Sequence, residues 1–198
     1  NSWSIYSSVL ICLASGYLIT GGLHIDGLMD TFDGIFAGEK KRLKAMKDSK
    51  VGSFGVQSLM FVTLIQIACI LKIQAQIIFV LPICLFWGRF SNLFLIEHFE
   101  YISFKRKSIS HKKFWKGLKK ESLISIIFLV MIIINQFIFL KSEQMLIKNL
   151  LFLLIGLFVC CKIPNILGNK IGGFNGDSCG TSVVIVETLM LFIYAIFL

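Results

Sequence analysis

The sequence predicts an all-α fold, a polytopic transmembrane bundle of about six spanning helices that forms a single domain over residues 1–198. Two observations carry this prediction. Hydrophobic residues make up 56% of the chain and charged residues only 16%, whereas a soluble domain has about 25% charged residues. The charges also fall in blocks between long apolar runs, which favours membrane helices over the core of a soluble protein.

Six apolar runs are long enough to cross a bilayer, which takes about 20 residues of helix. They occupy residues 3–20, 52–71, 77–96, 123–140, 146–163 and 181–198. The first run has no basic start and no small-residue cleavage site, so we do not interpret it as a signal peptide. The chain begins at Asn1 rather than Met, and we expect that it lacks an amino-terminal segment.

The basic residues predict the orientation of the bundle. Six Lys and Arg lie in residues 21–51 and eight in residues 97–122, whereas the connections on the other side hold only Lys72, Lys141 and Lys148. Lys and Arg concentrate on the cytoplasmic side of a membrane, so residues 21–51, 97–122 and 164–180 are predicted to face the cytoplasm, with both chain ends outside. The net charge of +9 is then explained by the orientation of the protein in membrane lipid. We therefore expect no nucleic-acid partner. The block 105–120 is interpreted as an interfacial amphipathic helix or as a contact for an anionic substrate.

Three aspartates in the first of these connections predict a metal site. If residues 26–33 are helical, Asp30 and Asp33 lie within about 40° of Asp26 around the helix axis. Carboxylates that close repel one another, and a divalent cation removes the repulsion. Oxygen ligands of this kind suit Mg²⁺ or Mn²⁺. His24 would point to the opposite face, where it is either a base or an interfacial polar residue.

Glycines and lysines near these aspartates indicate a ligand with phosphate groups. Gly22 and the other glycines of residues 21–38 allow close approach of the backbone to such a ligand. Lys47 and Lys50 can meet phosphate oxygens, and the amides at the start of the second span offer an anion site. A plain capped helix start remains the alternative interpretation.

A third segment, residues 171–187, adds two more acidic groups. Asp177 stands among four glycines at a predicted helix start. Glu187 lies about two turns inside the last span, where an acidic group is costly and marks a functional site by default. Its nearest counter-charge is Arg89, which either forms a structural pair with Glu187 or binds a phosphate.

The three segments match a known pattern in order along the chain. Residues 20–34 read T-G-G-L-H-x-D-G-x-x-D-T-x-D-G, residues 47–55 read K-D-S-K-x-G-x-x-G, and residues 172–180 read G-G-x-x-G-D-x-x-G with Glu187 ten residues after Asp177. Together they resemble the cobalamin synthase family, the adenosylcobinamide-GDP ribazoletransferases. The resemblance implies an enzyme of cobalamin biosynthesis in the bacterial inner membrane, with its active site in the cytoplasm. It would join GDP-activated adenosylcobinamide (GDP-cobinamide) to α-ribazole or its phosphate, release GMP and use Mg²⁺.

The resemblance also implies roles for individual residues. The metal ligands would be Asp26, Asp30, Asp33 and Asp177. Catalytic roles would fall to the same aspartates with Asp48 and His24, and substrate or phosphate binding to Lys47, Lys50, Arg89, Gly22, Gly173, Gly176 and Glu187. Two positions depart from the family pattern, because Lys50 stands where Arg is usual and Asn175 where Thr is usual. Family members are also longer at the amino end.

Other functions are weighed against this one. A CDP-alcohol phosphatidyltransferase would show D-G-x-x-A-R, but Asp30 and Thr31 occupy the last two positions here. A prenyltransferase would share the pair Asp26 and Asp30 but needs a second aspartate cluster. A transporter would place acids at mid-bilayer, where only Glu187 qualifies. A homo-oligomer is left open.

Overall fold

The computed structural model describes residues 3–102, 114–140 and 142–197. The described residues form eight α-helices and one short 3-10 helix, with Tyr101 and Phe174 joined by an isolated β-bridge. The helices are α1 (Ile5–Ile19), α2 (Leu23–Phe36), α3 (Arg42–Ala45), α4 (Ser53–Ile73), η1 (Gln74–Gln76), α5 (Ile77–His98), α6 (Leu118–Phe139), α7 (Glu143–Ile171) and α8 (Gly176–Phe197). The predicted all-α class is confirmed.

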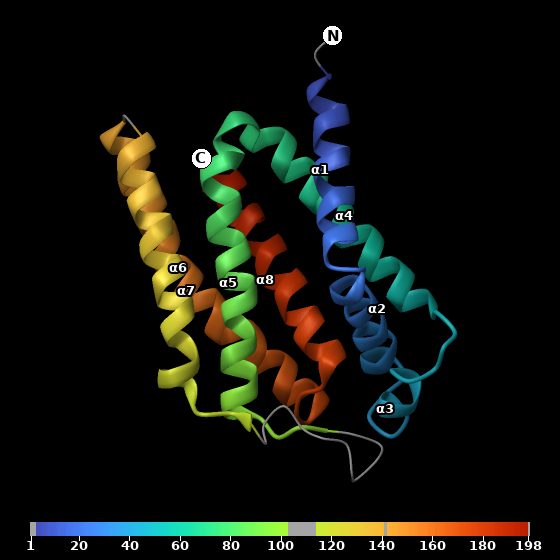
Figure 1. Cartoon of the computed structure of the whole chain (residues 1–198). Helices are drawn as coiled ribbons and strands as arrows, with labels where there is room; N and C mark the ends of the chain where they lie inside the picture. The colour runs from blue at the N-terminus through green and yellow to red at the C-terminus, as the bar shows by residue number, and fades with distance from the viewer. Residues whose placement is uncertain (1–2, 103–113, 141, 198) are drawn as a thin grey trace.

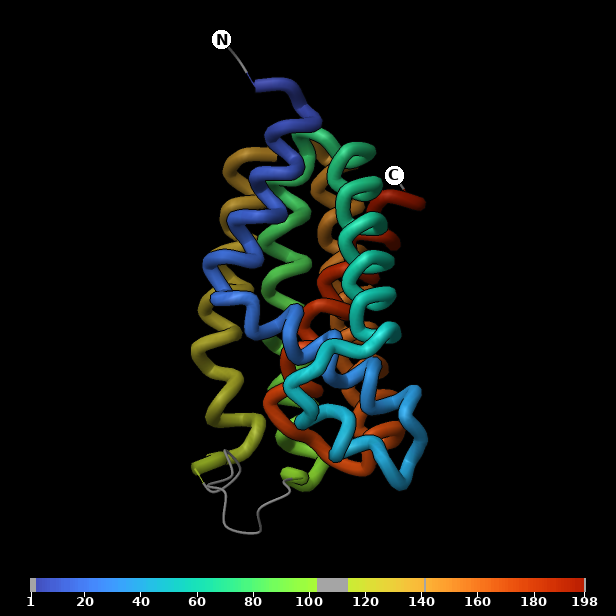
Figure 2. Tube along the Cα trace, turned by 90° about the vertical axis from the view of Figure 1, so that its right-hand side faces the viewer, coloured from blue at the N-terminus to red at the C-terminus, as the bar shows by residue number. Residues whose placement is uncertain are grey.

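The long helices α4 to α8 run up and down alongside one another, as Figures 1 and 2 show. At one end lie α2, α3 and the first turns of α4 and α8, and we call this the motif end because it holds the three glycine-rich segments. Both chain ends and the turns α4–α5 and α6–α7 lie at the opposite end (Figure 1). The fold therefore brings together segments that are more than a hundred residues apart in the chain.

Four described segments are long and apolar enough to cross a membrane: Ser53–His98, Leu118–Phe139, Glu143–Ile171 and Gly176–Phe197. The first contains both α4 and α5, and η1 turns the chain back between them (Figure 1). Helices α1 and α2 are long and apolar enough to cross a membrane only when they are taken together, and the chain bends by 84° between them. The 15 residues of α1 reach about 22 Å, less than the hydrocarbon core of about 30 Å. The protein is a membrane protein, and the number of six spans stays a prediction.

Three boundaries differ from the sequence-based expectations. Residues 21–51, expected as a connection, contain α2 and α3. Pro164 was expected to open the third connection, but it is buried inside α7, which continues to Ile171. A proline removes one helical hydrogen bond, and α7, which packs against α5, nevertheless continues through it. Of the predicted interfacial helix 105–120, residues 105–113 lie outside the described part, residues 115–117 are not helical, and residues 118–120 belong to the start of α6.

The core lies among α5, α7 and α8, away from the motif end. Trp87 of α5 packs directly on Gly156 of α7, where any side chain would collide with the indole ring. One polar network inside the bundle is satisfied internally: Asn149 donates to Gln136 Oε1 at 2.7 Å and accepts from the Tyr194 hydroxyl at 3.0 Å. Buried polar groups must be paired in this way when no water reaches them.

Candidate functional site

The bend between α1 and α2 places the predicted metal site. Gly21 and Gly22 have φ angles of 61° and 73°, a left-handed conformation that residues with a Cβ rarely adopt. They turn α2 by 84° from α1, so that α2 crosses the bundle near the motif end (Figure 2). The structure thus explains Gly22 by the turn, and its predicted contact with phosphate stays a prediction.

Helix α2 touches the start of α8 through backbone. A Cβ on Gly27 would lie 2.7 Å from the carbonyl oxygen of Asp177 and 2.9 Å from its Cα. The Thr181 hydroxyl lies 2.8 Å from the carbonyl oxygens of both Gly27 and Asp177, and so links the two helices. Gly180 of α8 packs in the same way on the backbone of His24. These close approaches bring Asp26, next to Gly27 in the chain, beside Asp177.

Asp33 joins α2 to the start of α4. Its Oδ2 accepts a hydrogen bond from the Gly52 amide at 2.7 Å, and its Oδ1 accepts one from the Gly55 amide at 2.8 Å. The sequence left two interpretations of this helix start open, a phosphate site and a plain cap, and in the structure its amides hold the Asp33 carboxylate. A helix start attracts any nearby anion because its first amides lack partners within the helix. A carboxylate has four lone-pair positions, so Asp33 keeps capacity for a metal ion.

The carboxylates of α2 and α8 act on one another. Burial and the charges of Asp26, Asp177 and Asp33, in that order, raise the pKa of Asp30 to about 6. Asp30 lies on α2, outside the four spanning segments. The charge of Lys47 in turn acts on Asp177. Negative groups from two helices therefore meet at one place, with a lysine beside them.

The donor set fits a hard cation that brings its own further ligands. Among residues 3–102, 114–140 and 142–197, no three His, Cys, Asp or Glu side chains are already arranged to hold a metal ion. Mg²⁺ is usually held by one or two carboxylates together with water and substrate phosphates, so a complete protein cage is not required. Burial and the neighbouring negative charges both disfavour an unpaired Asp30 carboxylate, so a positive charge beside it would be favourable. The ligands Asp26, Asp30, Asp33 and Asp177 stay predictions.

Asp177 is held by the cap of α8. The Asn175 Oδ1 accepts from the Ser178 amide, and the Ser178 hydroxyl accepts from the Asn175 amide, both at 2.8 Å. The Asn175 Nδ2 also donates to Asp177 Oδ2 at 3.0 Å. Sequence reasoning assigned no role to Asn175 or Thr181. The spacing Asn-x-x-Ser before an apolar run, which is typical of reciprocal helix caps, could have identified the first of them.

Other predicted residues lie at the edge of this cluster. Asp48 and Lys50 are exposed, and the Lys50 amide donates to Asp48 Oδ1 at 3.1 Å. Gly173 packs against the backbone of Glu100, where a Cβ would lie 2.6 Å from the carbonyl oxygen. The space around Gly176 is open, with nothing within 4 Å of a Cβ in the described residues. Their predicted contacts with substrate stay predictions.

Arg89, Glu187 and His24 form a second group. Arg89 Nη1 forms an ion pair with Glu187 Oε1, with side-chain exposures of 46% and 15% respectively. Both residues and His24 line a cavity of about 340 Å³ between α1, α2, α4, α5 and α8. Of the two interpretations of Arg89, the structure contains the pair with Glu187, and phosphate binding by Arg89 stays a prediction. His24 lies on a different face of α2 from the aspartates, as the helical spacing predicts.

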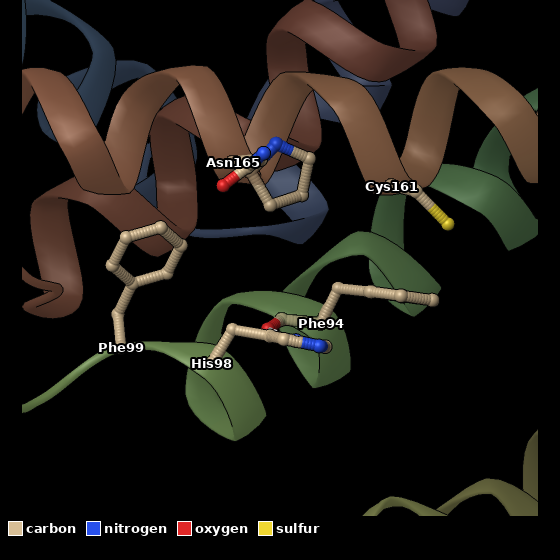
Figure 3. A pocket seen from close by; sticks show the side chains of 6 residues that line it. Phe94, His98, Phe99, Cys161 and Asn165 are labelled. Carbon is tan, nitrogen blue, oxygen red and sulfur yellow. Dashed lines mark hydrogen bonds between the residues drawn. The ribbon is translucent and has the colours of Figure 1, made fainter.

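A smaller cavity of about 190 Å³ lies between the end of α5 and α7 (Figure 3). His98 stacks on Phe94 there, with ring centroids 5.5 Å apart, and Cys161 and Asn165 face them from α7. His98 is exposed. None of the predicted site residues lines this cavity, so it stands apart from the aspartate cluster.

Comparison with known proteins gives one consistent result. The family model for cobalamin-5-phosphate synthase matches residues 2–195. An adenosylcobinamide-GDP ribazoletransferase of Prochlorococcus marinus is 42% identical over 99% of this chain and 76% of its own length. The enzyme of the same name from Caldanaerobacter subterraneus is 35% identical over 92% of this chain and 71% of its own length, and that of Clostridioides difficile is 30% identical over 95% and 74%. No solved structure matches the chain.

Proposed function

The chain belongs to the family of cobalamin-5-phosphate synthases, and we propose that it joins GDP-activated adenosylcobinamide to α-ribazole or its phosphate. The products are cobalamin or its phosphate and GMP. The observation that supports a site for this reaction is the convergence of Asp26, Asp30 and Asp177 from two helices, with Lys47 beside them. A diphosphate substrate needs a site in which metal ligands and cationic side chains lie together.

The reaction exchanges one phosphorus–oxygen bond for another. A ribose hydroxyl of ribazole attacks the phosphorus next to cobinamide, the bond from that phosphorus to the GMP unit breaks, and GMP leaves. The hydroxyl proton must pass to a base. Asp30, whose pKa is raised to about 6, can accept a proton near neutral pH. His24, Asp48 and Asp177 are the other candidates.

Each remaining group has a role that its position supports. Mg²⁺ held by Asp26, Asp30, Asp33 or Asp177 would neutralise charge on the diphosphate and its leaving oxygen. Lys47 lies near enough to act on Asp177 and would bind a phosphate oxygen, with Lys50 and Arg89 as further phosphate ligands. Asp33 also holds the start of α4 against α2, so that the Lys47–Lys50 segment stays close to the carboxylates.

We place the protein in the bacterial cytoplasmic membrane, surrounded by lipid, with the motif end facing the cytoplasm. The three predicted cytoplasmic connections carry most Lys and Arg, and the parts of them that the structure describes lie at the motif end. Basic residues remain on the cytoplasmic side during insertion. The site would then open to the compartment that contains the nucleotide substrate.

The test of this function uses the protein, expressed from its full reading frame, in lipid vesicles with GDP-cobinamide and ribazole phosphate. We expect GMP release with cobalamin phosphate as product when Mg²⁺ is present, and loss of release in excess EDTA. Release that persists in EDTA would contradict the metal site. No release from folded protein in Mg²⁺ would contradict the activity, and lipid-linked diphosphates would then be the next substrates to assay.

A further inference from the structure

The short helix α3 leads directly to the lysine that lies beside the carboxylates. It has four residues, Arg42–Ala45, and a helix of this length is not stable without contacts to the rest of the protein. Its hydrogen bonds continue past its end, because the amides of Met46, Lys47 and Asp48 donate to the carbonyl oxygens of residues 42, 44 and 45 at 3.0, 3.2 and 3.1 Å respectively. Residues 42–48 thus form one hydrogen-bonded unit, and the contacts that hold α3 also place Lys47.

One side of this unit packs on α2. The Met46 side chain is 2% exposed, and a Cβ on Gly34 would collide with it and lie 3.1 Å from the Arg42 carbonyl oxygen. The other side faces the end of α7 across a cavity of about 350 Å³, which Arg42, Leu43 and Lys170 help to line. The described residues do not fill this space, so close packing does not fix the distance between α3 and α7.

The Arg42 side chain connects the two elements on that side. Its Nη1 donates to the carbonyl oxygen of Ile171 at 3.4 Å, and Ile171 is the last residue of α7. The last carbonyls of a helix lack partners within the helix and carry the negative end of its dipole. A guanidinium, which is both a donor and a cation, is a suitable partner for them. Arg42 therefore ties α3 to α7 where packing does not.

The chain between Ile171 and Asp177 is held independently of α3. The Phe174 amide donates to the Glu100 carbonyl oxygen at 2.9 Å, and the Phe174 carbonyl oxygen accepts from the Ile102 amide at 2.8 Å. Phe174 itself is 1% exposed. This turn gives Asp177 a fixed place, relative to which residues 42–48 must be held.

The hydrogen bond between Arg42 and Ile171 links the segments that carry Lys47 and Asp177. Lys47 lies five residues after Arg42 on one side of the bond. Asp177 lies six residues after Ile171 on the other side, and the charge of Lys47 acts on it. We infer that Arg42 is a positioning residue, which ties α3 to the end of α7 and so holds Lys47 where a substrate phosphate would bind. The inference rests on the proposed function and adds to it a residue that acts through Lys47.

Arg42→Met tests this tie, because it removes the guanidinium and keeps an unbranched apolar stem. The Arg42 Nε is buried without a hydrogen-bond partner among the described residues, and such a donor is unfavourable. We therefore expect the variant to fold and to unfold near the wild-type temperature. Lys44→Met is the matched control, since Lys44 is an exposed cation of the same helix and does not line the cavity beside α7.

The two substrates separate a positioning role from a merely structural one. In Arg42→Met we expect the KM for GDP-cobinamide to rise about tenfold or more, because a small displacement of a group that orients the substrate is costly. The KM for ribazole, which carries no phosphate, should stay unchanged, and Lys44→Met should change neither value. A variant that was simply less well folded would lose kcat and keep both KM values.

A double variant tests whether Arg42 acts through Lys47. Lys47→Met alone should raise the KM for GDP-cobinamide, and adding Arg42→Met should raise it no further, because the group that Arg42 positions is already gone. Effects of residues that act through one another are not additive. If Arg42 itself bound a substrate phosphate, the two changes would multiply.

Hydrogen exchange tests the tie without any assay of activity. In Arg42→Met the amides of Lys47 and Asp48 should exchange faster than in wild-type protein, because the unit that contains them is less firmly held. The Gly52 and Gly55 amides, which donate to Asp33, provide the internal control and should exchange at the wild-type rate.

Three results would overturn the inference. One is an unchanged KM for GDP-cobinamide in Arg42→Met. Another is a further rise in that KM when Arg42→Met is added to Lys47→Met, which would make Arg42 a substrate ligand in its own right. The third is unchanged exchange at Lys47 and Asp48. Failure of the proposed function is distinct, because wild-type protein would then release no GMP, whereas the exchange measurement would still report on the tie.

Discussion

The Asp33 carboxylate accepts a hydrogen bond from the Gly52 amide at 2.7 Å, and it lies so close to the Gly52 Cα that a side chain there would overlap it. The Gly55 amide donates to the other oxygen of the same carboxylate at 2.8 Å, and a Cβ on Gly55 would lie 2.6 Å from Asp33 Oδ2. The glycines of the K-D-S-K-x-G-x-x-G segment are thus explained by an aspartate from α2 that caps α4.

This relationship predicts that substitutions at Asp33 and Gly52 are coupled. Asp33→Ala removes two hydrogen bonds to a charged group, each of which contributes about 1.5–3 kcal/mol, and Gly52→Ala displaces the carboxylate. In the double variant no carboxylate remains to be displaced, so Gly52→Ala should then cost little. Thermal or denaturant unfolding in detergent would measure a coupling energy of about 0.5–3 kcal/mol. Strict additivity of the two changes would contradict the cap.

Gly27→Ala should separate the two helices that carry the carboxylates. The added Cβ would meet the Asp177 backbone at 2.7 Å, and overpacking of this kind costs about 1–3 kcal/mol. We expect a lower unfolding temperature together with reduced GMP release, because Asp26 moves away from Asp177. Gly176→Ala provides the control for stability, since its Cβ meets nothing within 4 Å among the described residues. Full activity in Gly27→Ala would show that this contact does not position the site.

Asp30→Asn should abolish turnover, with a loss of at least about 100-fold, while membrane insertion stays intact. Asp30 is the carboxylate on which burial and three neighbouring negative charges act. Removing its charge relieves that repulsion, so the metal-free variant should unfold at the same temperature as wild-type protein or higher. GMP release and thermal unfolding, measured on the same vesicle preparation, test both parts. Wild-type activity in this variant would remove the metal-site hypothesis.

The pKa of Asp30 predicts how Mg²⁺ stabilises the fold. Folding raises this pKa from about 3.9 to about 6, so the folded metal-free protein holds the proton more tightly than the unfolded chain. The resulting stability is present at low pH and is lost as the pH rises through about 6. Mg²⁺ offsets the repulsion that remains above that pH. Unfolding temperatures with Mg²⁺ and with EDTA should therefore differ more at pH 7.5 than at pH 5, and an equal difference would argue against metal binding at Asp30.

The orientation is open to a chemical test. Glu39 lies between α2 and α3 at the motif end, and Ala75 lies in η1 at the opposite end. Both are exposed. In intact spheroplasts a membrane-impermeant maleimide should label Ala75→Cys, and it should label Glu39→Cys only after permeabilisation. The variants are compared with unsubstituted protein, which carries the six native cysteines. The reverse pattern of labelling would place the motif end outside.

Several features of the molecule follow from the sequence because they depend on local chemistry. Apolar runs of about 20 residues predict membrane helices, and the order of the three motifs along the chain indicates the family. Helical periodicity also separated His24 from the aspartates of α2, because residues two apart point to opposite sides of a helix. The ends of the helices could not be predicted from the sequence in the same way. Nothing local to Pro164 shows that α7 continues past it to Ile171.

The sequence by itself determined the helical membrane class, the segments rich in aspartate and glycine, and the family. Only the tertiary structure decided what those residues touch. The contact between Gly27 and Asp177 joins positions 150 residues apart in the chain. The start of α4, which from the sequence could equally be a phosphate site or a plain cap, holds Asp33. The cavity beside His24 likewise needs five helices at once. Residue spacing reports which side chains share one helix face, whereas long-range contacts depend on how whole helices pack, and no short stretch of sequence encodes that packing.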